Sequence, residues 1–373
     1  MRILVVAEGS GGHLIPALEM SRALTNQQAH VTLLYARRTP TAQLLQQLIH
    51  DARMDGVHVW PIRLPSGRRV WRKLWQAGRM WRLAQERLEI WQPHVVVGFG
   101  GWLSIPVVLA ARQRRIPIVI HEQNVRLGKA NRFLVRRHWV DRAALSFEKT
   151  GEELNGTPAT VTGLPIRRVL GLACREDAAR QFKLDPARPT ILVLGGSQGS
   201  QAVNRIACRM LSRLTDEQQR TWQFIHLTGG SDYAEVQSAY ERAGVRAWIA
   251  PHLVERAWAY ALADVVIARA GASTIAELAH CGTPSILIPY PYASGHQRDN
   301  ARVVEEAEAG VRLEEAEATP QRLHGLLWQF FANEHLRRTM GERMHVLAQP
   351  DATHRLAETV SDVVRTEISV PHA

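Results

Sequence analysis

The sequence contains no run of about 18 apolar residues, the length that a membrane-spanning helix requires. Its start, Met1–Ala7, enters a strand-like apolar run without the basic segment and long apolar core of a secretory signal. The three cysteines (Cys174, Cys208 and Cys281) stand without disulfide or metal-ligand spacing. We therefore expect a protein that neither spans a membrane nor is secreted, and that works in a reducing compartment.

Two common nucleotide-binding signatures are also missing. The first glycine loop, Gly9–His13, does not have the G-x-G-x-x-G spacing of a dinucleotide site. The next apolar run ends in Tyr35–Arg38, where a dehydrogenase needs an acidic residue for the ribose. The loop also lacks the Gly-Lys-Ser/Thr of a P-loop. A nicotinamide dehydrogenase and a P-loop nucleotidase are therefore disfavoured.

His13, at the end of this loop, is a candidate general base. Imidazole is the side chain most easily poised near neutral pH, and a glycine loop after a strand lets a ligand approach the backbone. The alternative is a histidine at a helix start that only contacts solvent.

The chain is 373 residues long, which favours two domains. Apolar runs alternate with helix-type patterns, which predicts parallel, doubly wound sheets. The first predicted strands are 2–7, 30–35, 57–61, 94–98 and 117–121, with helices near 16–25 and 105–114. The pattern restarts with strands at 190–194, 222–227, 246–249 and 264–268 and a last strand at 285–289. The fold class is thus α/β, with two Rossmann-like domains in tandem.

The boundary between these domains is predicted near Thr162–Pro165. We expect an N-terminal domain at 1–163 and a second domain at 164–350. Residues 351–373 form a third segment, in which a helix near 352–366 and a short tail pack back on the N-terminal domain.

Charge is unevenly divided between the two halves. Residues 1–165 hold 23 lysines and arginines against 11 acidic residues, whereas residues 166–373 hold 23 against 24. The first half is therefore expected to meet an anionic partner. On charge alone, nucleic acid, anionic lipid and a phosphorylated substrate all remain open.

A basic, tryptophan-rich stretch at 68–82 has the most unusual composition in the chain. Its apolar residues recur in steps of three and four, which predicts a helix with one core face. Two tryptophans lie off that face and arginines surround them, forming a candidate membrane patch of Trp71, Trp75, Arg68, Arg72, Arg79 and Arg82. Indoles ringed by guanidinium groups suit an anionic lipid surface. The alternatives are tryptophans packed on a neighbouring helix with solvated arginines, or RNA binding.

The stretch Ala270–Ala279 follows an apolar run and reads as strand, small turn and helix. Such a turn lets an anion approach the free N–H groups of the helix start. Glu277 would lie about one turn further in, where it can accept from a sugar hydroxyl. The alternative is an ordinary βα turn with Glu277 on a solvated face.

Seven motifs in order resemble those of the MurG family of N-acetylglucosaminyltransferases over almost the whole chain. They are Gly9–Ala17, Gly98–Pro106, His121–Asn124, Gly163–Arg167, Gly195–Gly199, Ala270–Glu277, and His296-Gln297 before Asn300-Ala301. The resemblance implies the GT-B fold, in which two Rossmann-like domains face each other across a cleft. It also implies a peripheral enzyme on the cytoplasmic face of the inner membrane.

The activity that the resemblance implies is transfer of GlcNAc from UDP-GlcNAc to lipid I, the undecaprenyl-diphosphate-linked MurNAc-pentapeptide. The muramic acid 4-hydroxyl attacks, the anomeric carbon inverts, and the product is lipid II for peptidoglycan and hence for cell shape and division. Neither a cofactor nor an active-site metal is implied, and nucleic acid is not an expected partner.

The resemblance also implies roles for particular residues. Arg167, Ser197 and the helix start Ala272-Ser273-Thr274 would stabilise the departing diphosphate, while Glu277 would hold the ribose hydroxyls. The backbone of Leu253 would meet uracil and Gln297 would hold GlcNAc hydroxyls. The remaining substrate-binding positions are Ser10, Gly11, Gly12, Asn124, Ile275 and Ala276, with His13 as the candidate base.

The first loop departs from its relatives, because Ala7-Glu8 stands where the family has Gly-Gly. Glu8 must turn away from a diphosphate or the acceptor site is altered. The main rival is therefore a GT-B transferase of another glycolipid or natural product. A protein that binds anionic lipid or RNA without catalysis is a second rival, and it predicts no UDP-GlcNAc binding.

Overall fold

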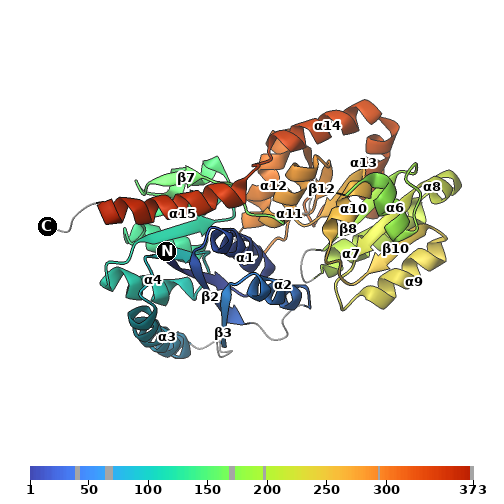
Figure 1. Ribbon diagram of the computed structural model, residues 1–373. Coiled ribbons are helices and arrows are strands. Elements are labelled where there is room, and N and C mark those ends of the chain that lie inside the picture. Colours follow the sequence, from blue (N-terminus) through green and yellow to red (C-terminus); the bar gives the residue numbers. More distant parts are fainter. Residues whose placement is uncertain (38–42, 64–69, 168–172, 196–198, 293–294, 370–373) are drawn as a thin grey trace. The chain divides into compact units, whose positions relative to one another are not determined.

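The structure, a computed structural model, describes residues 1–37, 43–63, 70–167, 173–195, 199–292 and 295–369 (Figure 1). Within these ranges, side chains are described except at 37, 43–44, 63, 70–76 and 367–369. The chain forms two compact units, each with its own sheet and core. The N-terminal unit comprises Met1–Ile166 and Pro350–Ala373, and the C-terminal unit comprises Arg167–Gln349.

The N-terminal unit contains a parallel sheet of seven strands in the order β3-β2-β1-β4-β5-β6-β7. The strands are β1 (Arg2–Glu8), β2 (His30–Arg37), β3 (His58–Arg63), β4 (Val95–Gly98), β5 (Ile118–Glu122), β6 (Arg142–Leu145) and β7 (Ala159–Val161). The order reverses between β1 and β4, which pair directly with Val6 opposite Gly98. Ligands of doubly wound sheets bind at the carboxyl ends of strands at such a reversal.

The C-terminal unit repeats this arrangement with six parallel strands in the order β10-β9-β8-β11-β12-β13. They are β8 (Thr190–Leu194), β9 (Gln223–Leu227), β10 (Arg246–Ala250), β11 (Val265–Ala268), β12 (Ser285–Leu287) and β13 (Gly310–Arg312). Here the order reverses between β8 and β11, where Leu194 lies opposite Ala268.

Helices connect the strands of both sheets. In the N-terminal unit they are α1 (Gly11–Asn26), α2 (Gln43–Met54), α3 (Val70–Trp91), α4 (Ser104–Gln113), α5 (Lys129–Arg136), the 3₁₀ turn Glu148–Glu153 and α15 (Ala352–Ser369). In the C-terminal unit they are α6 (Arg175–Phe182), α7 (Gln201–Met210), the 3₁₀ turn Leu211–Arg213, α8 (Asp216–Thr221), α9 (Tyr233–Ala243), α10 (Arg256–Leu262), α11 (Ala272–Cys281), α12 (His296–Glu306), α13 (Pro320–Ala332) and α14 (Glu334–Val346). The last helix, α15, returns to the N-terminal unit and lies against α1, β4 and β6.

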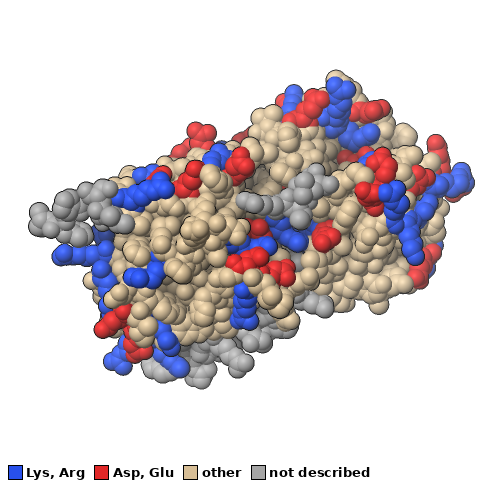
Figure 2. All heavy atoms as spheres, viewed as in Figure 1, with Lys and Arg blue, Asp and Glu red and all other residues tan. Residues whose placement is uncertain are grey.

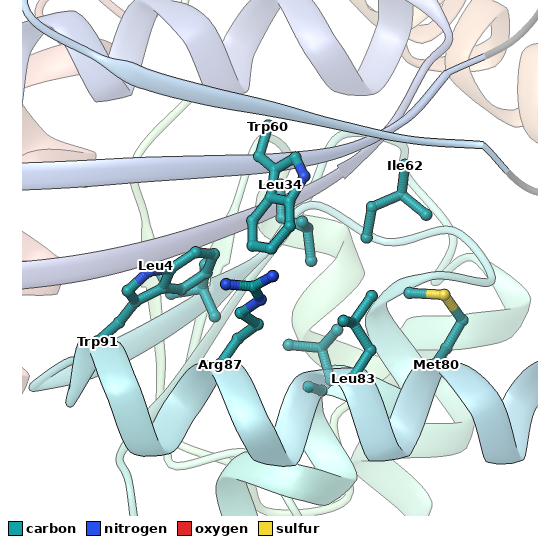
Figure 3. Close-up of a pocket in the computed structure, with 10 residues that line it drawn as sticks. Leu4, Leu34, Trp60, Ile62, Met80, Leu83, Arg87 and Trp91 are labelled. Carbon is teal, nitrogen blue, oxygen red and sulfur yellow. The ribbon is translucent and has the colours of Figure 1, made fainter.

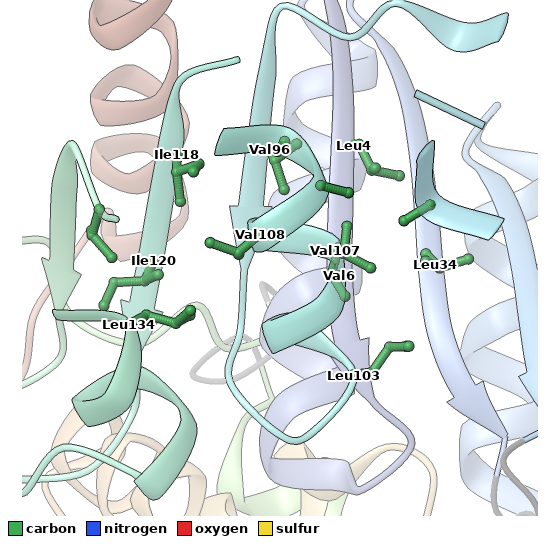
Figure 4. Packing of buried hydrophobic residues seen from close by; sticks show 14 of the residues in the cluster. Leu4, Val6, Leu34, Val96, Leu103, Val107, Val108, Ile118, Ile120 and Leu134 are labelled. Atoms are coloured by element: carbon green, nitrogen blue, oxygen red, sulfur yellow. The ribbon is translucent and has the colours of Figure 1, made fainter. Parts of the chain in front are cut away.

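The central strands β4, β8 and β11 are buried along their whole length, as expected of sheets that helices cover on each side. In the N-terminal core, Leu103 and Val107 from the α4 region pack over Leu4, Val6 and Val96 of the central strands (Figure 4). The C-terminal core is built in the same way and centres on buried residues such as Phe224, Tyr240 and Phe330. Each sheet therefore holds its loops on a close-packed base.

The predicted alternation of strands and helices is confirmed, with three additions. Strands β6, β7 and β13 were not predicted, so 285–289 is not the last strand. Helix α1 begins at Gly11 rather than near Pro16, which lies inside it. Proline inside a helix removes one backbone hydrogen bond, and α1 accepts that loss. As a result the glycines of the first loop form the first turn of α1.

Of the helices that the structure describes, none combines the length and the apolar character needed to cross a bilayer. On the face drawn in Figure 2, acidic and basic side chains are interspersed over both units.

Candidate active site

The turn between β11 and α11 lies at the strand-order reversal of the C-terminal sheet. Gly271 is the N-cap of α11 and offers no side chain to cap it, and the first turn contains no acidic residue. The N–H of Ile275 is used by the Gly271 carbonyl at 3.0 Å. The N–H groups of the residues before it, Ala272, Ser273 and Thr274, belong to the turn that a helix cannot satisfy internally. This is the position for an anion that the sequence predicted.

Ser273 adds a second feature of the same kind. Its Oγ is buried and has no hydrogen-bond partner among the described residues. A buried hydroxyl without a partner loses free energy that a ligand can restore. The first turn of α11 therefore offers both backbone and side-chain donors to an anion.

Glu277 lies further along α11 and is 7% exposed. Its Oε2 accepts hydrogen bonds from the Tyr260 hydroxyl at 2.8 Å and from Arg256 Nη1 at 3.3 Å. Burial, together with the Glu277 carboxylate, raises the pKa of Tyr260 well above its ordinary value, so its hydroxyl stays a donor. The alternative of a solvated Glu277 is therefore wrong, because the carboxylate is buried and held in place by two groups of α10.

The loop that leads into α10 contains Leu253, which is half-buried. Arg167 Nη1 donates to the carbonyl of the next residue, Val254. Arg167, Leu253 and Glu277 are thus joined through the start of α10. Three of the predicted donor-binding positions are brought together in this way.

Gln297 is the second residue of α12, and its Oε1 accepts from the Tyr290 N–H at 2.9 Å. The bond fixes the amide so that its NH₂ group is the end that can donate to a sugar oxygen. Ser197 lies outside the described residues. Gly199, at the end of the loop that contains Ser197, lies against the backbone of Thr228. A Cβ on Gly199 would lie 2.5 Å from the Thr228 carbonyl oxygen.

Arg269 directly follows β11, and no sequence motif had pointed to it. It is 8% exposed. Its guanidinium donates to Ser200 Oγ at 3.0 Å and to the carbonyls of Ile288 and Pro289 at 3.2 and 3.1 Å. Its Nη1 also forms an ion pair with Glu315. Arg269 thereby joins the loops that follow β8, β11 and β12, and it positions the turn that begins α11.

In the N-terminal unit, Ser10 is the N-cap of α1 and Gly11 and Gly12 begin the helix. The Ser10 hydroxyl does not cap the backbone but lies 2.7 Å from His13 Nδ1. On its other side the His13 ring faces the second glycine loop, since a Cβ on Gly100 would lie 3.6 Å from Nε2. His13 is therefore held between the loops that follow β1 and β4.

Asn124 is held by the neighbouring Glu122, which is 2% exposed. Glu122 Oε1 accepts from both the backbone N–H and the side-chain amide of Asn124, at 3.1 and 3.2 Å. Its Oε2 accepts from Gly128 N–H at 2.8 Å and Asn131 Nδ2 at 2.9 Å. Four donors satisfy this carboxylate, so it orders the loop after β5.

The described part of the membrane patch is small. Arg79 and Arg82 are exposed on α3, whereas Met80, Ala84 and Leu88 of the same helix are buried in the core. Arg68 and the side chains of Trp71, Arg72 and Trp75 lie outside the described residues.

Further along α3, Trp60 of β3 packs edge-on against Trp91 with 5.0 Å between ring centroids. Arg87 stacks on the Trp60 ring at 4.2 Å. These residues line a small apolar pocket between α3 and the strands (Figure 3). Where its side chains are described, α3 therefore packs on the core through one face.

Comparison with known proteins identifies the family. The model of the glycosyltransferase family 28 N-terminal domain matches residues 3–141, and that of the family 28 C-terminal domain matches residues 190–356. A relative from Desulforamulus reducens is 32% identical over 98% of this chain and 99% of its own. The chain belongs to glycosyltransferase family 28. This relative is named UDP-N-acetylglucosamine–N-acetylmuramyl-(pentapeptide) pyrophosphoryl-undecaprenol N-acetylglucosamine transferase.

Three further comparisons concern one relative and two solved structures. A relative of the same name from Halothermothrix orenii is 33% identical over 98% of this chain and all of its own. The crystal structure of Acinetobacter baumannii MurG matches with a TM-score of 0.74 and 25% identity, covering 97% of this chain and 99% of that one. A kitacinnamycin glycosyltransferase has the same fold, with a TM-score of 0.72 at 17% identity. The GT-B fold and the MurG family are therefore confirmed.

Proposed function

We propose that this chain transfers GlcNAc from UDP-GlcNAc to the muramic acid 4-hydroxyl of lipid I, with inversion, and so produces lipid II. The observation that carries the proposal is the similarity over nearly the whole chain to relatives named for this reaction. It includes both family 28 domains rather than the nucleotide-binding half alone.

The geometry of the C-terminal unit supports the role of donor site. The uncapped first turn of α11 and Ser273 Oγ supply donors for the diphosphate, whose negative charge grows as the bond to the sugar breaks. Glu277 is fixed through Oε2 by Tyr260 and Arg256, which leaves Oε1 to accept from the ribose hydroxyls. Leu253 and Gln297 are assigned to uracil and GlcNAc, and Arg167 and Ser197 to the diphosphate.

The N-terminal unit is assigned to the acceptor. Its two glycine loops follow β1 and β4, and His13 lies between them. His13, whose Nδ1 lies 2.7 Å from the Ser10 hydroxyl, is assigned as the general base that takes the proton of the attacking hydroxyl. Ser10, Gly11, Gly12 and Asn124 complete the acceptor loops.

We further propose that the enzyme acts at the cytoplasmic face of the membrane as a peripheral protein. The acceptor is a lipid, and the N-terminal unit carries the excess of basic residues. Arg79 and Arg82 are exposed on α3, as a contact with anionic headgroups requires.

The deciding experiment measures release of UDP from UDP-GlcNAc with and without a short-chain lipid I analogue. We expect release that depends on the acceptor and a product that contains one added GlcNAc. Absence of acceptor-dependent release would overturn the proposal. Release with a different glycolipid or a natural-product aglycone, but not with lipid I, would support the rival GT-B reading instead.

A binding measurement tests the donor assignment separately. Glu277→Ala should weaken UDP binding about tenfold or more, because a charge-assisted hydrogen bond contributes roughly 1.5–3 kcal/mol. Glu235, on α9 of the same unit, provides the matched control, and Glu235→Ala should leave UDP affinity unchanged. Equal affinity in the Glu277 variant and the wild type would remove Glu277 from the ribose site.

A further inference from the structure

Glu8, the last residue of β1, reaches into the second glycine loop. Its Oε1 accepts a hydrogen bond from the backbone N–H of Trp102 at 2.9 Å. The contact is close along the whole side chain, because a Cβ built on Gly101 would lie 1.8 Å from Glu8 Cγ. A carboxylate is therefore seated in the loop that leads into α4.

Helix α4 has no anion of its own at this end. Its N-cap is Leu103, no side chain caps it, and its first turn contains no acidic residue. The amino end of a helix favours negative charge. Glu8 supplies that charge from the neighbouring strand, and it takes up a backbone N–H that an incoming anion would otherwise use.

The amino end of α1 is different, although β1 and β4 are adjacent in the sheet. Its first turn also lacks an acidic residue, and the hydroxyl of its N-cap, Ser10, is directed to His13 instead of the backbone. Of these two neighbouring helix starts, one carries a carboxylate and the other does not.

We propose that Glu8 is a specificity-determining residue of the acceptor site, which excludes an acceptor phosphate from the α4 loop and directs it to the start of α1. The inference rests on the proposed function, since it assigns the two loops to the acceptor diphosphate. A phosphate oxygen that reached the Trp102 N–H would have to displace a carboxylate of like charge, which is unfavourable.

The test compares Glu8→Gln with Glu8→Gly. The glutamine keeps the size of the side chain and an oxygen for the Trp102 N–H but removes the charge. The glycine removes the side chain and leaves the N–H open. Asp141→Asn is the matched control, because Asp141 accepts the backbone N–H of Ile118 at 2.7 Å, ahead of β6 rather than after a strand.

The first readout is binding of inorganic pyrophosphate by calorimetry, with saturating UDP present to fill the donor unit. We expect Glu8→Gln to bind pyrophosphate about tenfold more tightly than the wild type, and Glu8→Gly at least as tightly. Asp141→Asn should match the wild type. Unchanged or weaker binding in Glu8→Gln would overturn the proposal.

The second readout is kinetic. The KM for the lipid I analogue should fall in Glu8→Gln while the KM for UDP-GlcNAc stays constant, since the donor unit is untouched. A higher acceptor KM would show that Glu8 helps to bind the acceptor, which also contradicts the proposal. If the wild type shows no acceptor-dependent UDP release, the proposed function fails, but the pyrophosphate result still judges the role of Glu8 as an anion barrier.

Discussion

The glycine loops of the two units make room for different neighbours. In the N-terminal unit, Gly101 has φ +81° and leaves space for the Glu8 side chain, 1.8 Å from where a Cβ would stand. In the C-terminal unit, Gly199 has φ +79° and leaves space for backbone, since a Cβ would lie 2.5 Å from the Thr228 carbonyl oxygen. One substitution can change a side-chain neighbour, whereas a backbone neighbour is set by the fold.

This difference parallels the division of work that we propose for the two units. The C-terminal unit, proposed to bind the donor, is fixed by main-chain contacts and by Arg269, which joins three loops. The N-terminal unit, proposed to bind the acceptor, contains a loop in which one side chain, Glu8, fills the space beside Gly101. A transferase can therefore keep its donor while its acceptor site changes by substitution at positions such as residue 8.

The largest expected effect comes from replacing these two glycines, Gly199 and Gly101, by alanine. Gly199→Ala should lower the free energy of unfolding by about 4 kcal/mol or more, because strain and a clash with backbone add. Gly101→Ala should cost about 3 kcal/mol, since strain combines with overpacking against Glu8. Adding Glu8→Ala should restore about 2 kcal/mol of the free energy of unfolding to Gly101→Ala and none to Gly199→Ala. Urea unfolding of the single and double variants measures both values.

Gly156 separates strain from crowding in this experiment. It has φ +80°, and a Cβ there meets no atom within 4 Å. Gly156→Ala should therefore cost only the strain, about 1–2 kcal/mol. A loss in Gly101→Ala equal to that in Gly156→Ala would show that Glu8 does not fill the space beside Gly101.

The next effect concerns a buried histidine in each unit. Burial is the main cause that lowers the pKa of His121 to about 4 and that of His226 to about 3. Both rings are held neutral in the same tautomer. His121 Nε2 donates to the Gly163 carbonyl at 3.1 Å and His226 Nε2 donates to Asn204 Oδ1 at 3.0 Å. Nδ1 accepts a hydrogen bond from Gln123 Nε2 in His121 and from the Tyr240 hydroxyl in His226. Protonation of Nδ1 would therefore break that hydrogen bond in either ring.

Because the unfolded chain takes up these protons near the ordinary pKa of 6.5, stability must fall as the pH falls below that value. Each histidine should remove about 2 kcal/mol between pH 6.5 and about pH 4.5. Below about pH 4 the His121 contribution ends, whereas that of His226 continues to about pH 3. Calorimetry against pH checks this, and His226→Gln should flatten the curve of the C-terminal unit alone. An unchanged slope in that variant would refute the assignment.

Strands β8 and β13 show which strands the sequence alone can predict and which it cannot. The strand 190–194 was predicted with the bounds that the structure gives, because four apolar residues follow Thr190 in one run. β13 was missed, since Gly310–Arg312 is short and ends in an arginine. What makes it a strand is its pairing with β12, a tertiary contact that no local pattern contains.

The candidate site shows the same limit. The helix start at Ala272 could be predicted because strand, small turn and helix follow one another in the sequence. The start of α1 was expected near Pro16 and lies at Gly11 instead. The partners of Glu277 could not be predicted, because Tyr260 and Arg256 belong to another helix and only folding brings them to the carboxylate. The position of Glu8 was left open for the same reason.

A smaller effect sharpens the comparison at the proposed donor site. Tyr260→Phe removes the hydroxyl that holds Glu277, while Tyr240→Phe removes the one that donates to His226 Nδ1. Both should lower the free energy of unfolding by about 1–2 kcal/mol, since each breaks a buried hydrogen bond. Only Tyr260→Phe should also weaken UDP binding, by about threefold to tenfold. Equal UDP affinity in the two variants would mean that Glu277 needs no support from α10.

The last contrast between the units concerns their surface charge. Replacing Arg79 and Arg82 of α3 by serine should weaken binding to vesicles that contain anionic lipid by about thirtyfold, because each basic residue at such a surface contributes roughly 1 kcal/mol. The loss should disappear at high salt and should not affect transfer to a soluble acceptor.

Arg209 and Arg220 are exposed residues of the C-terminal unit and provide the matched pair. Since both pairs remove the same charge, a general electrostatic effect would weaken vesicle binding equally in the two double variants. A loss confined to the α3 pair would instead assign the membrane contact to the N-terminal unit, to which we also assign the acceptor. The lipid substrate and the lipid surface would then be met by the same half of the molecule.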